Sequence, residues 1–106
     1  VPYVPPPDTQ LLDAWREYHR FMITPATKGM TPQQLQWVRN VARRHPHPST
    51  LIRYALAMGL NGQADESSRV VRAICNLHAP ISCQRARALW QSAQAQYPEL
   101  VAIHMP

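Results

Sequence analysis

The chain has 106 residues, of which 45% are hydrophobic, and it contains 11 prolines but only 3 glycines. This length predicts one domain, which can bury a core without the help of metal ions or disulfide bonds. The apolar content excludes general disorder, and the absence of long alternating β-branched runs argues against a sheet protein. The sequence therefore predicts an all-α fold of five or six short antiparallel helices across residues 8–106, after a proline-rich linker at residues 1–7.

The formal net charge is +5, and all but one of the 11 cationic side chains are arginines. Such a charge is typical of proteins that bind nucleic acid, phosphate or lipid headgroups. The arginines are spread along the chain, however, and a solvated surface explains that distribution more simply. A candidate interaction surface consists of the outer-face arginines of two predicted helices: Arg39, Arg43, Arg69 and Arg72. A basic helical binding module for nucleic acid or another polyanion is therefore an alternative interpretation, and not the favoured one.

The sequence begins with Val and carries no charged-then-apolar signal segment, so we expect a piece of a longer protein. None of its apolar runs reaches the roughly 20 residues that a membrane span requires. We therefore expect no membrane span in this piece.

The first helix is expected from a cap at Asp8 or Thr9 to about Ile23. Its apolar stripe consists of Leu11, Ala14, Trp15, Tyr18, Phe21 and Met22. Aromatic residues at this spacing are consistent with a binding platform, but packing in the core explains them more simply. We therefore expect this stripe to be buried.

The second helix has a clear start, because Thr31 can cap it, Pro32 suits its first position and Gln34 completes a capping box. It is expected to end in the basic turn at residues 43–45, before Pro46 and Pro48. His45 and His47 alternate with these prolines, and such a pair is consistent with metal binding or a pH switch. Polar residues in an exposed turn are the simpler interpretation.

The next two helices, expected at about 51–60 and 64–77, form the predicted centre of the fold. The first is apolar almost all round, with Arg53 as its only charged residue, which is typical of a buried helix. The second is amphipathic, and Asp65 and Glu66 suit its first turn because the helix dipole favours negative charge there. Gly62 suits the left-handed residue after a helix end, so we expect an antiparallel hairpin.

A last long helix is expected after a turn at residues 79–81, with Ser82 as its cap and Pro98 at its end or at the start of a short final turn. Its predicted inward stripe is Cys83, Ala86, Leu89, Trp90, Ala93 and Tyr97.

The two cysteines allow a disulfide, a pair of buried thiols or part of a metal site. Cys75 and Cys83 are eight residues apart across a proline turn, and a disulfide there would join two helices. A zinc site would combine them with His78 and His104, but the spacing matches no standard zinc motif. A Gly-rich phosphate loop and the usual hydrolase motifs are absent from the sequence, and adjacent helix residues such as Asp65 and Glu66 point about 100° apart. We therefore expect no catalytic residue, metal or cofactor here.

Residues 51–77 resemble a helical hairpin of the tetratricopeptide type. Gly62, the pair Asp65 and Glu66, and Val71 stand near the usual turn and helix positions of that repeat. Ser67 stands where the repeat usually has alanine. One unit is visible, so the sequence does not predict a repeat array.

A broader resemblance covers most of the chain. It is carried by WREYHRF at 15–21, RYAL at 53–56, LNGQADE at 60–66, Trp90, and YPEL at 97–100. These segments are similar to the C-terminal domain of bacterial membrane-bound polymerase/ligase proteins related to O-antigen ligases. Within that group, they most resemble the pilin-glycosylating protein O-oligosaccharyltransferases.

The resemblance implies a multi-pass inner-membrane parent that transfers a lipid-linked oligosaccharide to protein hydroxyls, with its catalytic residues upstream of this chain. This piece would be a non-catalytic domain on the periplasmic side. It would help the enzyme to bind a pilin-like acceptor protein, or stabilise the enzyme through contact with its membrane domain. An oxidising compartment also favours the disulfide between Cys75 and Cys83 over the other two states.

Overall fold

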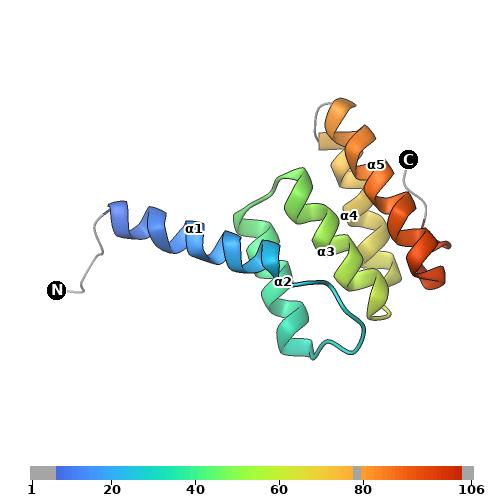
Figure 1. The fold of residues 1–106 in the computed structure, drawn as a ribbon, viewed down its shortest axis with the longest axis horizontal. Coiled ribbons are helices and arrows are strands. Elements are labelled where there is room, and N and C mark those ends of the chain that lie inside the picture. Colours follow the sequence, from blue (N-terminus) through green and yellow to red (C-terminus); the bar gives the residue numbers. More distant parts are fainter. Residues whose placement is uncertain (1–6, 78–79, 104–106) are drawn as a thin grey trace.

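The computed structural model describes residues 7–77 and 80–103 (Figure 1). These residues form five α-helices, one 3-10 turn and no strand, which confirms the predicted all-α fold. In chain order the elements are α1 (Pro7–Ile23), α2 (Pro32–Arg44), α3 (Pro48–Leu60), α4 (Ala64–Leu77), α5 (Pro80–Gln96) and the 3-10 turn η1 (Pro98–Leu100). The predicted linker at residues 1–7 lies outside the described residues except for Pro7, which begins α1.

The helix starts combine one confirmed cap with three shifted boundaries. One of these is at α1, which begins at Pro7, so the expected caps Asp8 and Thr9 lie inside the helix. Thr31 Oγ1 accepts a hydrogen bond from Gln34 N at 3.1 Å, and Gln34 Oε1 accepts one from Thr31 N at 2.8 Å, so the predicted capping box is present. Pro48 and Pro80 were expected before their helices, but they begin α3 and α5, and the expected cap Ser82 lies inside α5. Proline suits the first helical position because its φ is already helical and an N–H there would lack a partner.

The central helix is α3, which contacts α2, α4, α5 and η1. Every residue from Leu51 to Leu60 is buried or half-buried, which confirms the predicted buried segment. One side of α3 packs with α4, α5 and the C-terminal turn, in a cluster of Ile52, Ala55, Leu60, Val70, Val71, Ile74, Ala86, Trp90, Ala93, Leu100 and Ile103. The other side packs with α1 and α2, in a cluster of Phe21, Leu35, Val38, Val41, Ala57 and Met58. The two halves of the core therefore meet at α3.

α3 and α4 form the predicted antiparallel hairpin (Figure 1). Gly62 in the turn has a φ of +78°, the left-handed conformation that favours glycine. Ser67 of α4 is fully buried, and its Oγ donates a hydrogen bond to the carbonyl oxygen of Ala55 at 2.7 Å. A Cβ on Gly59 would lie 2.6 Å from Leu100 Cδ2. Small side chains on this hairpin therefore allow close packing of its neighbours.

The C-terminal turn is attached to α5 by side-chain hydrogen bonds. Trp90 is 1% exposed, and its Nε1 donates to the carbonyl oxygen of Ile103 at 2.8 Å. Gln94 Nε2 donates to the carbonyl oxygens of Leu100 and Ile103 at 3.1 and 3.0 Å. The inward position of Trp90 is therefore confirmed. The prediction for Leu89 was wrong, because this side chain is 56% exposed and faces a hollow between α3 and α5.

α1 differs most from its prediction. Figure 1 shows that it extends away from the other helices and crosses α2 near its own C-terminal end. Phe21 is 3% exposed and contacts Trp37, but Trp15 is 60% exposed. Among residues 12–23, core packing therefore holds for the last turns, and the side chain of Leu11, also in the predicted stripe, lies outside the description. The sequence pattern was correct for an amphipathic helix. The error was the assumption that another element covers its whole length.

Candidate functional site

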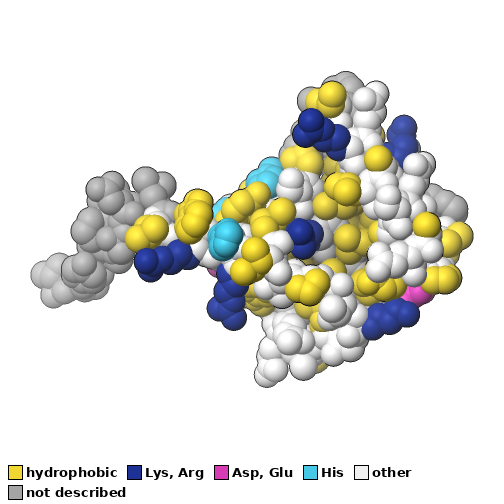
Figure 2. Space-filling model, in the orientation of Figure 1, with side chains coloured by type: hydrophobic (Ala, Val, Ile, Leu, Met, Phe, Trp, Pro, Cys, Tyr) yellow, Lys and Arg dark blue, Asp and Glu magenta, His cyan; other side chains and the backbone are white. Residues whose placement is uncertain are grey.

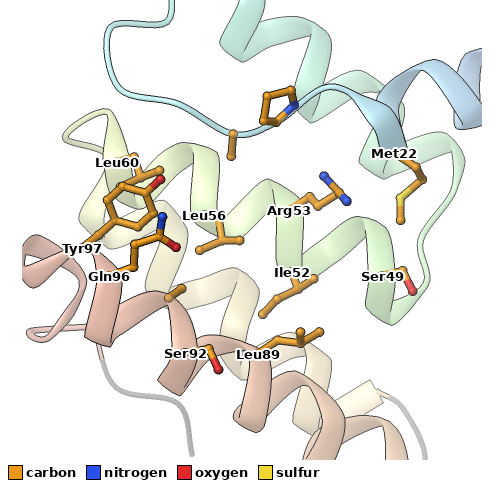
Figure 3. Close-up of a pocket in the computed structure, with 13 residues that line it drawn as sticks. Met22, Ser49, Ile52, Arg53, Leu56, Leu60, Leu89, Ser92, Gln96 and Tyr97 are labelled. Atoms are coloured by element: carbon orange, nitrogen blue, oxygen red, sulfur yellow. The ribbon is translucent and has the colours of Figure 1, made fainter.

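A groove runs between α3 and α5 and is closed on its third side by the end of α1 and the following loop (Figure 3). Its volume is about 430 Å³. Its walls are mostly hydrocarbon, from Met22, Pro25, Ala26, Ile52, Leu56, Leu60, Leu89, Ala93 and Tyr97. We call it the apolar groove. It is a hollow of the size that binds a small ligand or part of a peptide, and it lies directly on the central helix.

The apolar groove contains one charged side chain, Arg53 of α3, which Figure 3 shows projecting between the loop and Met22. None of the described residues that line the groove is acidic. Arg53 is half-buried, and within the described part of the chain no hydrogen bond or ion pair to it is found. Figure 2 shows hydrophobic side chains over the middle of the molecule, with a cationic side chain among them. The sequence marked Arg53 as the only charge on an apolar helix, but did not indicate the groove.

A second groove lies between α2, α3 and α4, and three of the four predicted interaction residues line it. Arg39, Arg43 and Arg69 come together there, whereas Arg72 does not reach it. Arg72 is exposed on the outer face of α4, where its Nη2 donates to Ser68 Oγ at 2.9 Å. We call this second hollow the basic groove.

Glu66 reduces the positive charge of the basic groove. Its carboxylate accepts hydrogen bonds from Arg39 Nε at 2.7 Å and Arg39 Nη2 at 2.9 Å, and a further one from the Tyr54 hydroxyl. The hydrogen bonds from Arg39 are the main reason why the pKa of Glu66 is lowered. Burial, followed by the bond to Glu66, raises the pKa of Tyr54 to about 12, so the phenol stays protonated. Sequence reasoning assigned Glu66 only to the helix dipole and missed this contact between three helices.

The turn between α2 and α3 is packed, contrary to the expectation of an exposed polar turn. His45 Nε2 lies 3.1 Å from Glu17 Oε2, and the rings of His45 and His47 both contact Tyr18. Arg44 also binds Glu17, with its Nε 2.9 Å from Oε2, and this bond is the largest cause of the lowered pKa of Glu17. These contacts attach α1 to the turn, which gives the histidines a structural role.

The two cysteines are joined in the structure as a disulfide. The Cys75 and Cys83 sulfurs are 2.15 Å apart and their Cα atoms 4.7 Å apart, so the bond connects the end of α4 to the start of α5. Sulfurs paired in this way are not thiolate ligands for zinc, and the other two candidate ligands, His78 and His104, lie outside the described residues. Across residues 7–77 and 80–103, no three His, Cys, Asp or Glu side chains gather as a metal site would need.

None of the helices in the described part of the chain combines the length and apolarity of a membrane crossing.

Comparison with known protein families identifies a family for most of the chain. The model of the family described as virulence factor membrane-bound polymerase, C-terminal, matches residues 6–97. Neither a curated protein nor a solved structure matches the chain, so the likeness of the α3–α4 hairpin to a tetratricopeptide unit stays a prediction. The family match includes α1 to α5 and both grooves. The chain belongs to the family of C-terminal domains of membrane-bound polymerases that are classed as virulence factors.

Proposed function

We propose that this chain is a non-catalytic domain of a protein O-oligosaccharyltransferase, on the periplasmic side of the inner membrane, and that it binds the acceptor protein. The observation that carries the proposal is the apolar groove on α3, an open binding surface in a domain of a membrane-bound polymerase family. The resemblance of the sequence to pilin-glycosylating enzymes supports a pilin-like acceptor. The disulfide between Cys75 and Cys83 supports an oxidising compartment.

The role is tested by deleting residues 8–106 from the full-length parent and measuring glycan transfer to its acceptor in cells. We expect transfer to fall, or acceptor choice to broaden, at equal levels of parent protein in the membrane. Unchanged transfer and unchanged acceptor choice would contradict the role. The compartment is tested separately by blocking free thiols in intact cells before and after reduction. Cys75 and Cys83 should react only after reduction.

The basic groove favours a second candidate, which is binding of a polyanion. Arg43 and Arg69 lack ion pairs within the described residues, whereas Arg39 is already paired with Glu66. Two available cations predict a slope of about −2 when the logarithm of the DNA-binding constant is plotted against the logarithm of salt concentration. Proteins that depend on such binding contact more phosphates, so we rank this candidate second. Tight DNA binding with a much steeper slope would reverse the order.

A further inference from the structure

The apolar groove continues beyond the hollow of Figure 3. Its residues Ser49 and Leu89 also line a neighbouring hollow that reaches Arg85 on α5. Along α3 the groove spans Ser49 to Leu60, which is about 16 Å at the helical rise of 1.5 Å per residue. An extended peptide advances about 3.3 Å per residue, so about five residues fit this length.

The polar groups of the groove are suited to a peptide. Ser49, Ser92 and Gln96 line its rim, and within the described part of the chain no hydrogen bond to their side chains is found. A peptide backbone needs such partners, because each N–H and C=O group that it buries must be hydrogen-bonded. A lipid chain would need none of them. The hydrocarbon walls between these groups would cover apolar side chains of the peptide.

Arg53 gives the groove a charge preference. A half-buried guanidinium between hydrocarbon walls, with no carboxylate beside it, leaves its N–H donors to water. An arginine fork matches a carboxylate geometrically, and a charge-assisted hydrogen bond gains strength where apolar walls exclude water. The bound segment should therefore carry one carboxylate near its centre.

We propose that the apolar groove binds a short, extended, apolar segment of another protein, and that a carboxylate of this segment pairs with Arg53. The identification of that protein as the glycosylation acceptor rests on the proposed function. The peptide chemistry itself follows from the groove. Arg53 acts here as a specificity-determining residue.

The test is a binding measurement on the 106-residue chain. The probes are fluorescently labelled seven-residue peptides with capped ends, made of valine and leucine around a central glutamate or, in the matched peptide, glutamine. We expect the glutamate peptide to bind about tenfold more tightly, which is typical of one charge-assisted hydrogen bond at a partly buried site. The Arg53→Gln variant should bind both peptides with equal affinity. The control Arg72→Gln, on the outer face of α4, should keep the full preference.

A second variant tests the walls of the groove. Leu89→Gln changes an exposed side chain, so the fold should be preserved, and both peptides should bind several-fold more weakly. Vesicles of anionic lipid serve as a third probe. The inference would be overturned if neither peptide bound, if the Arg53→Gln variant kept the preference for glutamate, or if the chain bound only the vesicles. These outcomes are separate from the deletion test in cells. Transfer that depends on the domain without peptide binding would leave the proposed function standing and reject this inference.

Discussion

The Glu66 carboxylate joins α2, α3 and α4, so its removal should weaken the fold measurably. It accepts hydrogen bonds from two nitrogens of Arg39 and from Tyr54. The Arg39 and Glu66 side chains are only 21% and 17% exposed, so water screens this pair less than a surface ion pair. Glu66→Gln keeps the size of the side chain but removes its charge. One charge-assisted hydrogen bond contributes about 1.5–3 kcal/mol, so we expect a loss of about 2 kcal/mol in the free energy of unfolding.

The assay is urea unfolding at pH 7, together with a thermal melt. For a domain of this size, a loss of about 2 kcal/mol lowers Tm by about 10 °C. Asp65→Asn is the matched control, because Asp65 is exposed, adjacent and also in the first turn of α4. It should cost only the helix-dipole contribution of about 0.5 kcal/mol. Equal losses in the two variants would refute the reasoning, since Glu66 would then act through the dipole alone.

The same residue predicts a pH dependence. Hydrogen bonds from Arg39 lower the pKa of Glu66 in the folded state below the ordinary value of 4.5. A carboxyl with a lowered pKa contributes stability that is fully present above its unfolded-state pKa and is lost as pH falls through its folded-state pKa. The stability difference between wild type and Glu66→Gln should therefore be constant near neutral pH and shrink below pH 4.5. A difference that stayed constant into acid would contradict this assignment.

Three further changes test the packing. Phe21→Ala should lower the free energy of unfolding, measured with urea, by about 3 kcal/mol. Trp15→Ala, on the exposed part of α1, should change it by no more than about 0.5 kcal/mol. Similar losses in the two variants would contradict the description of α1. Reduction of the Cys75–Cys83 disulfide should lower stability by about 2.5 kcal/mol, measured by melts with and without a reductant. Ser67→Ala should lower the free energy of unfolding by only about 0.5 kcal/mol, because the lost hydrogen bond is partly offset by the better helix propensity of alanine. Ser67→Leu should lower it by at least about 2 kcal/mol in the same melts.

The sequence predicted those parts of the fold that depend on local chemistry. Thr31 and Gln34 form their capping box because the two residues are three positions apart, whatever packs around them. The start of α4 follows from the turn at Gly62 and the acidic first turn. The prolines were ambiguous, because a proline such as Pro48 can end one helix or begin the next.

The parts that depend on distant partners were not predictable. The period of the α1 stripe shows that the helix is amphipathic, but not that Trp15 lies beyond the reach of the other helices. Glu66 already had a sufficient local role, and its partner Arg39 is 27 residues away. Arg53 was visible as a lone charge, whereas the groove around it depends on how α5 lies against α3. The candidate site therefore depends on contacts between residues that are far apart in the sequence.

The length of α1 sets the distance between the start of this helix and the other helices. Its 17 residues make a rod of about 25 Å, and its described contacts with the other helices come from its last two turns. The start of this rod is therefore about one helix length from Met22, which lies at its other end and lines the apolar groove. In a membrane-bound polymerase such a spacer would keep the grooves clear of the lipid headgroups and reachable by large partners. Removing whole turns from the first half of α1 would shorten this distance in steps of about 5.4 Å and would leave every groove residue unchanged.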